Sequence, residues 1–172
     1  MNPESEAETG DEPMGRFRGS INVQVEAARL FDHLDDQVKL SAHMTRRSLM
    51  MGGGRMTYEF DPLLGQAVGS VIRMSGSAFG ISLFVEEVVT ERVPPVRKRW
   101  RTVGTPRLLI LDSYEMGFDI SQNGATSVVE VWISYVPRWQ NGFRGRIAGI
   151  LSAQYARWCV RRMLNDAVRL TA

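Results

Sequence analysis

The C-terminal stretch, residues 137–172, places the strongest constraint on what this chain can fold into. Beyond Gly149 it contains neither Gly nor Pro, so it predicts one long α-helix that would span roughly 45 Å at about 1.5 Å per residue. Helices in globular proteins average only about 11–12 residues. A helix of this length needs a second large element against which to bury its apolar residues.

The apolar residues of this helix do not fall on one stripe. At about 100° per residue, one side carries Phe143, Ile147, Ile150, Leu151 and Trp158, and another carries Val160, Met163, Leu164, Ala167 and Val168. We therefore expect the buried face to change between residues 155 and 159. Such a change fits a helix that packs on a curved sheet at one end and covers a hollow at the other.

Composition indicates a globular protein and excludes several classes. Hydrophobic residues make up 44% and charged residues 23% of the 172 residues, as in ordinary globular domains. No apolar run approaches the roughly 20 residues of a membrane-spanning helix, and no secretory signal is visible at the N-terminus. The single Cys159 excludes an internal disulfide and a thiol zinc cluster. These features predict a cytoplasmic protein without a transmembrane segment.

Charge divides the chain into two parts. Residues 1–15 carry five acidic residues and no Lys or Arg, which is typical of a disordered, solubilising tail. Taking those five charges away from the net charge of +2 leaves +7 on the remainder. We expect residues 1–15 to form a disordered acidic N-terminal tail and residues 16–172 to form a single domain.

The middle of the chain reads as strands. After a first alternating strand at 16–25, two short helices are expected at 26–34 and 37–44. Six strands then follow at 55–60, 67–75, 81–91, 96–104, 107–121 and 126–136. Asn123-Gly124 lies between two alternating runs and is a strong hairpin signal. Because short connections join only antiparallel neighbours, the chain predicts an α+β fold in which a curled seven-stranded antiparallel sheet, with two short helices after its first strand, wraps around the C-terminal helix.

Three segments resemble a known family. The run VPPVRKRWRTVGTPRLLILDSYEMGFDI, followed by SVVEVWISYVP and YARWCVRRM, is similar to bacterial polyketide cyclase/dehydrase-like proteins of the START/Bet v 1-like helix-grip (SRPBCC) superfamily. The resemblance covers residues 16–170. It implies the helix-grip fold with a deep apolar cavity between sheet and helix. Members bind lipids, sterols, aromatic polyketides or other hydrophobic metabolites, and a minority use the cavity for catalysis.

Asp112 and Tyr114 are the candidate catalytic residues. Asp112 falls in an alternating row of the 107–121 strand that is otherwise apolar or aromatic, and a buried carboxylate needs a partner. Lys98, Trp100 and Thr102 on the preceding strand are candidate partners. A carboxylate there, beside Tyr114, would act as a general acid/base. The alternative is that Asp112 lies at a strand bulge or edge and faces water.

Aromatic, methionine and aliphatic side chains are expected to line the cavity, because such residues suit an irregular apolar pocket. The predicted ligand-binding residues are Phe84, Trp100, Thr102, Tyr114, Met116, Phe118, Ile133, Tyr135, Ile147, Leu151 and Trp158.

The sequence contains neither a metal-binding nor a phosphate-binding motif. His33 and His43 are the only imidazoles and have no metal-ligand spacing with each other or with Cys159. The glycine run at 52–54 lacks the Lys-Ser/Thr of a phosphate-binding loop. We therefore predict no metal site and no cofactor, and we interpret Cys159 as a small buried thiol.

Three functions remain open from the sequence. The first is non-catalytic binding or transport of a hydrophobic small molecule such as a lipid, quinone or aromatic polyketide-like compound. The second is an enzyme of the polyketide cyclase/aromatase type that uses Asp112 and Tyr114. The third is a ribosome- or membrane-associated module that uses Arg97, Arg99 and Arg101, although no specific nucleic-acid motif is present. Nothing in the sequence decides between a monomer and a homodimer.

Overall fold

The structure is a computed structural model, and it describes residues 15–38 and 56–170. Outside the described residues lie positions 1–14 of the predicted acidic tail, His43, the glycine run at 52–54 and most of the second short helix. Only Gln37 and Val38 of that helix are described, and both are helical. Gly15, the last residue of the predicted tail, is described and begins a strand.

Seven antiparallel strands form one sheet, as predicted. The strands are β1 (Gly15–Val23), β2 (Met56–Phe60), β3 (Val71–Ala78), β4 (Ile81–Val93), β5 (Arg97–Arg107), β6 (Leu111–Asn123) and β7 (Thr126–Pro137). Their order across the sheet is β1-β7-β6-β5-β4-β3-β2. The first strand thus crosses to pair with the last one, while β2 to β7 form a meander. The hairpin at Asn123-Gly124 is confirmed, and Gly124 has the positive φ of 59° that its turn requires.

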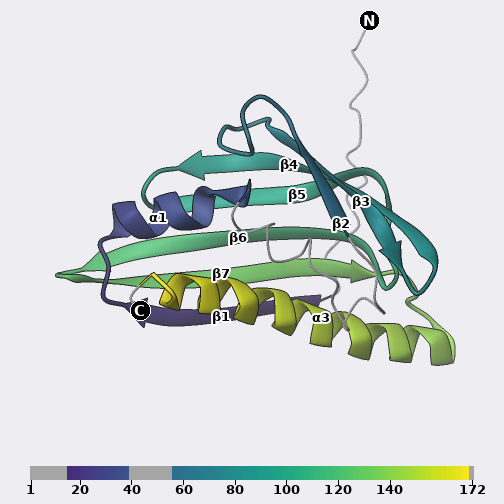
Figure 1. The fold of residues 1–172 in the computed structure, drawn as a ribbon. Coiled ribbons are helices and arrows are strands. Elements are labelled where there is room, and N and C mark those ends of the chain that lie inside the picture. Colours follow the sequence, from purple (N-terminus) through teal and green to yellow (C-terminus); the bar gives the residue numbers. More distant parts are fainter. Residues whose placement is uncertain (1–14, 39–55, 171–172) are drawn as a thin grey trace, which may run out of the picture.

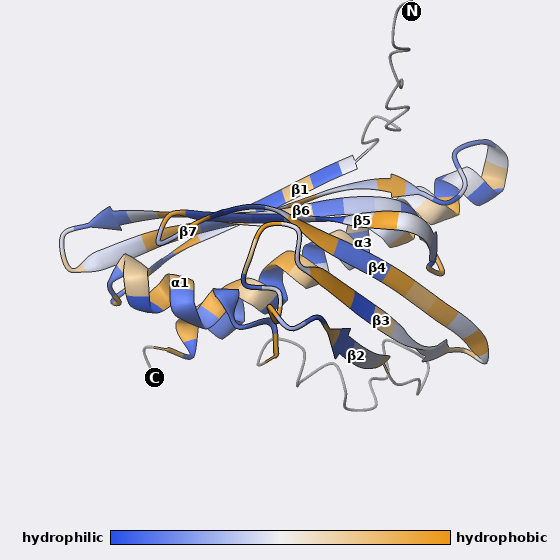
Figure 2. Cartoon of the chain, turned by 90° about the horizontal axis from the view of Figure 1, so that it is seen from above, coloured by the Kyte–Doolittle hydropathy of each residue, from blue (hydrophilic) through white to orange (hydrophobic). Residues whose placement is uncertain are grey.

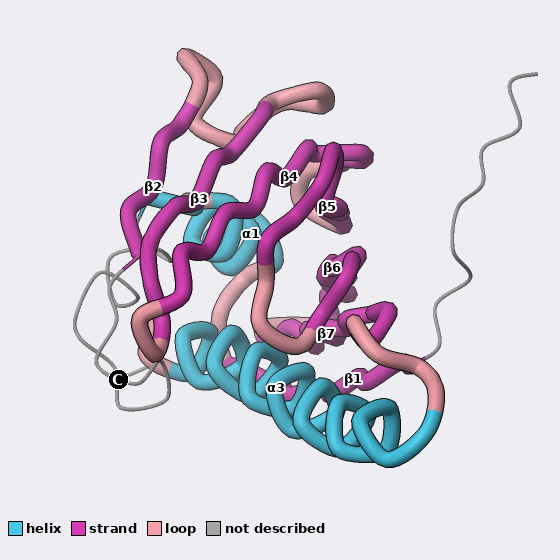
Figure 3. The backbone as a smooth tube through the Cα atoms, turned by 90° about the vertical axis from the view of Figure 1, so that its right-hand side faces the viewer, coloured by secondary structure: helices cyan, strands magenta, loops and turns pink. Residues whose placement is uncertain are grey.

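The sheet curls around two helices (Figures 1 and 3). Helix α1 (Ala27–Asp35) buries Ala27, Leu30, Phe31 and Leu34, whose spacing gives one apolar stripe. Helix α3 (Gly142–Val168) runs along the concave side and packs chiefly on β1 and β7. Phe31 of α1 meets Phe118 of β6 edge to face, with 5.6 Å between ring centroids. This is the helix-grip arrangement that the sequence predicts.

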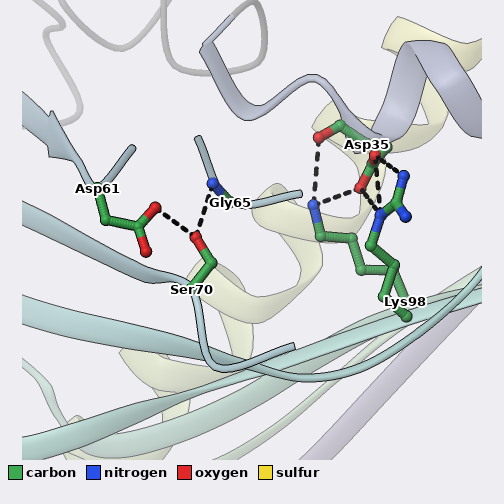
Figure 4. A network of polar contacts seen from close by, with 6 residues as sticks. Asp35, Asp61, Gly65, Ser70 and Lys98 are labelled. Atoms are coloured by element: carbon green, nitrogen blue, oxygen red, sulfur yellow. Dashed lines mark hydrogen bonds and ion pairs between the residues drawn. The ribbon is translucent and has the colours of Figure 1, made fainter. Parts of the chain in front are cut away.

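Buried and more exposed residues alternate along the strands, as is typical of strands with one buried face. Figure 2 shows hydrophobic and hydrophilic bands following one another along β3 and β4. The β3 boundary differs from the prediction, because residues 67–70 form a turn. There Asp61 accepts hydrogen bonds from Ser70 Oγ at 2.6 Å and from the Val71 amide at 3.0 Å, while Ser70 Oγ accepts one from the Gly65 amide (Figure 4). These bonds turn the chain between β2 and β3 and delay the start of β3.

Helix α3 corrects one expectation about its faces. Its buried residues form one continuous stripe: Gly145, Ala148, Ser152, Ala156, Val160, Met163, Asp166 and Ala167. The buried face does not change along the helix; the side chains on it change from small to large. The N-terminal half lies close to its neighbours, since a Cβ on Gly145 would come within 2.6 Å of the Gln140 backbone. Phe143, Ile147, Ile150 and Leu151 are therefore exposed and not buried as predicted.

Candidate ligand-binding site

A cavity of about 130 Å³ lies between the concave face of the sheet and the C-terminal half of α3. Strands β2 to β7 contribute one wall, and α3 contributes the other. The walls are mostly aromatic, methionine or aliphatic side chains, with a few polar groups. The lining residues are Gln37, Tyr58, Met74, Glu87, Trp100, Tyr114, Met116, Ile133, Tyr155, Trp158, Cys159, Arg162, Met163 and Asp166.

The change in side-chain size along α3 helps to position this cavity. The buried stripe of the N-terminal half consists of the small residues Gly145, Ala148 and Ser152. Here α3 lies close to the segment before β6, and Ser152 Oγ donates a hydrogen bond to the Ile110 carbonyl at 3.2 Å. From Tyr155 onward, larger side chains face the sheet.

Glu87 is a buried carboxylate in this cavity. It lies on β4 between the buried Val85 and Val89, and only 5% of it is exposed. One carboxylate oxygen accepts a hydrogen bond from the hydroxyl of Tyr114 on β6. Burial raises the pKa of Glu87 to about 7, although Tyr114, Lys98 and Trp100 oppose the rise. Near neutral pH, Glu87 therefore exchanges between its charged and neutral forms.

The hydroxyl and thiol groups around Glu87 remain protonated. Burial raises the pKa of Tyr58 and of Tyr114, and the pKa of Tyr155 is raised by its neighbour Cys159 and by burial. Burial also raises the pKa of the Cys159 thiol to about 12. Because the thiolate is the reactive form of cysteine, Cys159 is not an activated nucleophile. Its interpretation as a small neutral thiol agrees with this geometry.

Another buried carboxylate, Asp35, ends α1 and is held by two cations (Figure 4). Lys98 Nζ lies 2.7 Å from Asp35 Oδ1, and Arg92 donates two hydrogen bonds to Asp35 Oδ2, at 2.8 and 3.1 Å. Burial by itself would raise the pKa of Asp35, but the hydrogen bonds from Arg92 and Lys98 outweigh it and lower the pKa. Lys98 is fully buried, and this cluster fastens α1 to β4 and β5.

Asp112 does not line this cavity, which corrects its predicted position; it lines a second, polar hollow together with Tyr114. A register shift between Leu111 and Ser113 opposite β7 inserts one residue into β6 at Asp112. The extra residue reverses which side chains point inward, so Leu111 is buried and Asp112 is exposed. The structure therefore agrees with the alternative interpretation, in which Asp112 lies at a strand bulge and faces water. Tyr114 does face the cavity, but its carboxylate partner is Glu87.

Five of the predicted ligand-binding residues line the cavity: Trp100, Tyr114, Met116, Ile133 and Trp158. Phe118 and Tyr135 are buried in the main core and do not line it. Phe84 lies elsewhere, with the guanidinium of Arg107 6.0 Å from its ring centroid. Ile147 and Leu151 are exposed, for the reason given above for α3.

Thr102 has a structural position at a gap between β5 and β6. The two strands pair as far as Arg101 and Glu115, and there Thr102 Oγ1 accepts a hydrogen bond from the Tyr114 amide at 3.2 Å. Beyond this point a polar hollow of about 510 Å³ opens between the strands. Tyr114 lines both this hollow and the cavity, so Thr102 fixes the backbone of the residue that lies between them.

The arginine row of β5 is largely neutralised. Arg97 donates hydrogen bonds to Asp119 at 2.6 Å and to Glu91 at 3.2 Å. Arg99 lies 3.1 Å from Glu91 and 5.7 Å from the Trp132 ring centroid. These pairs agree with an ordinary solvated face. The pairs reduce the free charge of Arg97 and Arg99, two of the three arginines of the predicted basic interaction surface at Arg97, Arg99 and Arg101.

The described residues offer neither a metal site nor a membrane span. No group of three or more His, Cys, Asp or Glu side chains among them could hold a metal ion. None of the helices described, α3 included, combines the length and apolar character of a bilayer-spanning segment.

Comparisons with known proteins identify the fold. No family model matches the chain, and no curated protein matches it by sequence. Among solved structures, TTHA0849 from Thermus thermophilus aligns with a TM-score of 0.65 at 14% identity over 89% of this chain and 94% of its own. Norcoclaurine synthase from Thalictrum flavum, in complex with dopamine and hydroxybenzaldehyde, aligns at 0.61 and 13% identity, over 91% of this chain and 85% of its own.

A third match is the di-domain ARO/CYC BexL from the BE-7585A biosynthetic pathway. It aligns with a TM-score of 0.59 at 16% identity, and the match covers 91% of this chain and 50% of BexL. Sequence identities this low establish a shared fold only. The ligand and any activity have to be argued from the residues of the site. The chain has the helix-grip fold of the Bet v 1-like (SRPBCC) proteins.

Proposed function

We propose that this protein binds a small hydrophobic molecule in the cavity and that a polar group of the ligand hydrogen-bonds to the Glu87–Tyr114 pair. The observation that carries this proposal is a mostly apolar cavity with one buried carboxylate–phenol pair in its wall. Ligand sites of proteins have this character, with a few polar groups that fix orientation. Bet v 1-like folds typically bind hydrophobic ligands, which supports the same conclusion.

The size of the cavity narrows the ligand class. Its volume is about 130 Å³, and an engineered apolar cavity of about 150 Å³ accepts benzene. A compound of one or two rings, such as a quinone head group or a small aromatic ketone, fits this space better than a sterol or a long acyl chain. Glu87 and Tyr114 favour a ligand with a carbonyl or hydroxyl group. A carbonyl accepts a hydrogen bond from the Tyr114 hydroxyl or from protonated Glu87, and a hydroxyl can also donate one to the ionised carboxylate.

Binding can be tested by NMR with one- and two-ring aromatic ketones and quinones as probes. Saturable shifts at Trp100, Met116 and Tyr114 are the expected result. Met116→Trp places a larger side chain into the cavity and should weaken binding by at least about fivefold, since overfilling a packed site costs roughly 1–3 kcal/mol. Val68→Trp, at a position that is 60% exposed, is the matched control.

Two results would contradict the proposal. One is an absence of saturable shifts for every probe in the wild-type protein. The other is equal binding by the wild type, Met116→Trp and Val68→Trp, because that would place the probe outside the cavity.

The pKa of Glu87 favours a second candidate function, catalysis of the polyketide cyclase/aromatase type. A general acid/base works best when its pKa lies near the working pH, and that of Glu87 is about 7. Ionised Glu87 would take a proton from the carbon next to a ligand carbonyl and become a neutral carboxyl group. The Tyr114 hydroxyl would turn from Glu87 and donate its hydrogen bond to the carbonyl oxygen, which becomes the oxygen of an enolate. BexL and norcoclaurine synthase have this fold, so the fold is compatible with enzymes.

Glu87→Gln separates the two candidates. Glutamine keeps a hydrogen-bond acceptor for Tyr114 but cannot take up the proton. An enzyme would retain probe binding and lose turnover of an accepted polyketone by roughly 10²–10⁴-fold. A binding protein would show no turnover with either form, and that outcome would exclude the second candidate for the substrates tested.

A further inference from the structure

The N-terminal half of α3 carries an exposed apolar surface. Exposed fractions are 78% for Phe143, 64% for Ile150, 47% for Leu151 and 42% for Ile147, and Trp139, just before the helix, is 43% exposed. We call these five residues the apolar ridge. The ridge exists because the small residues of the buried stripe bring this half of the helix close to its neighbours and turn its large side chains outward. It lies at the end of α3 opposite the C-terminus, at the lower right of Figure 1.

The same segment is strongly basic. Residues 131–165 contain no Asp or Glu but six arginines, at positions 138, 144, 146, 157, 161 and 162. Arg144 and Arg146 are exposed and lie beside Phe143 and Ile147 in the first turns of α3. Within the described part of the chain, neither Arg144 nor Arg146 forms an ion pair.

The end of the helix adds further positive potential. The first turn of α3 holds no acidic residue, and the side chain of Asn141 makes no capping hydrogen bond. The amide groups of a helix N-terminus carry a partial positive charge. The ridge therefore lies within a region that attracts anions for three reasons: the arginines, the helix end and the lack of carboxylates in residues 131–165.

We propose that this surface docks the protein on an anionic lipid surface, with the apolar ridge inserted among the acyl chains and Arg144 and Arg146 at the lipid phosphates. Interfacial helices combine Trp, Phe and Leu on one side with Lys or Arg beside them, and they bind through apolar burial together with attraction to anionic lipids. Such docking is peripheral and needs no spanning segment.

Two other partners fit less well. A symmetric pair of chains joined through this face would bring Arg144 and Arg146 of both copies together, and like charges at an interface are unfavourable. A nucleic acid would pair with the arginines but would leave Phe143 and Ile150 against a wet, polar surface. A lipid surface offers phosphates to the two arginines and acyl chains to the apolar ridge.

The test is flotation of the full chain with vesicles of phosphatidylcholine alone and of phosphatidylcholine mixed with phosphatidylglycerol. We expect binding to the mixed vesicles and little binding to the neutral ones. The double variant Arg144→Gln/Arg146→Gln should bind roughly thirtyfold more weakly at low salt, at about 1 kcal/mol per arginine. Phe143→Ser/Ile150→Ser should lose at least about tenfold, since buried apolar area is removed.

Matched controls decide whether the site or the general charge of the protein is responsible. Arg18→Gln/Arg29→Gln removes two charges elsewhere on the surface, and Val68→Ser removes an exposed apolar side chain away from α3. Binding of these controls like the wild type supports the proposal. Three results would overturn it: no binding to the anionic vesicles, equal losses in the controls, or a wild-type dimer that Phe143→Ser/Ile150→Ser makes monomeric without vesicles. A circular dichroism spectrum equal to that of the wild type shows that each variant is folded.

Discussion

Glu87 on β4 and Asp35 at the end of α1 are both almost completely buried, at 5% and 2% exposed, but their neighbours differ. Asp35 accepts hydrogen bonds from two cations, Lys98 and Arg92, and its pKa is lowered. Glu87 accepts one from the neutral hydroxyl of Tyr114, and burial raises its pKa to about 7. Burial raises the pKa of Glu87 beside a neutral hydroxyl, whereas the hydrogen bonds and charges of Arg92 and Lys98 outweigh burial at Asp35, so Asp35 is a fixed charge and Glu87 titrates near neutral pH.

The difference corresponds to position in the molecule. Asp35 joins a helix to the sheet, where a permanent charge with paired partners stabilises one arrangement. Glu87 faces a cavity, where a group that changes its protonation state can adapt to a ligand or exchange a proton with it. The following predictions either enlarge or remove this contrast.

The largest effect is expected from Asp35→Ala. This change leaves the ammonium of Lys98 buried without its carboxylate, and breaking a buried ion pair from one side costs about 3–5 kcal/mol in the free energy of unfolding. Urea denaturation measures the loss. As a control, Glu86→Ala breaks the exposed Arg73–Glu86 pair and should cost at most about 1 kcal/mol. Equal losses in the two variants would contradict the structural role assigned to Asp35.

The dependence of stability on pH should separate the two carboxylates. The pKa of Glu87 rises from an ordinary value of 4.5 to about 7 on folding, so its contribution is complete below pH 4.5 and is lost as the pH rises through 7. The loss amounts to at most about 3 kcal/mol. The lowered pKa of Asp35 has the opposite effect, because its contribution is present above pH 3.8 and is lost as the pH falls through its folded-state pKa.

Glu87→Gln checks this assignment. The free energy of unfolding of the variant, measured by urea denaturation from pH 2 to pH 8, should lose the decline that the wild type shows above pH 4.5. The acid-side decline due to Asp35 should remain in both proteins. The same slope for the two proteins between pH 5 and pH 8 would mean that the pKa of Glu87 is not raised.

Tyr114→Phe should have a smaller effect. The Tyr114 hydroxyl lowers the pKa of Glu87 by its hydrogen bond, so its removal should raise that pKa further, as read by a carbon-13 NMR titration of the carboxyl group. Loss of a hydrogen bond to a buried acceptor costs about 1–3 kcal/mol. Tyr135→Phe, at another buried tyrosine that does not line the cavity, should leave the Glu87 titration unchanged. A pKa that falls in Tyr114→Phe would refute the pairing.

The smallest effect is expected from Asp112→Asn. Asp112 is exposed on the β6 bulge, and exposed substitutions away from structural features change stability by less than about 0.5 kcal/mol. Probe binding should also equal that of the wild type. A loss of binding in this variant, without a loss of stability, would return Asp112 to the site.

Much of the architecture was predictable because it depends on patterns that repeat over many residues. Alternation of apolar and polar residues marked the strands, and the turn at Asn123-Gly124 fixed a hairpin register between β6 and β7. The start of β3 was not predictable in the same way. It depends on hydrogen bonds from Asp61 to a residue nine positions later, which no local pattern shows.

The site was predictable only in part. A bulge of one residue reversed the expected orientation of Asp112, since side chains in a strand alternate with period two. Glu87 was missed although a signal existed: it follows Leu83 and Val85 and precedes Val89 in the buried row of β4. Its neighbour Glu86 and the nearby Glu91 make the segment look like a charged surface. The partner of a buried carboxylate lies on another strand and is visible only in three dimensions.

Helix α3 shows the same limit for packing. Large apolar residues usually mark the buried face of a helix, and this rule selected Phe143, Ile147, Ile150 and Leu151. The contact of Gly145 with the backbone of Gln140 instead admits only a small residue there, and the buried stripe of this half consists of Gly145, Ala148 and Ser152. This contact with the segment before the helix is visible only in three dimensions.

The most direct test of the central claim is native mass spectrometry of the purified protein, followed by organic extraction of whatever is bound. We expect a stoichiometric adduct with the mass of a one- or two-ring compound, which is absent from Met116→Trp and present in Val68→Trp. A wild-type protein without any adduct, whose spectrum does not change on addition of the aromatic ketone and quinone probes, would contradict the claim that this cavity is a ligand site.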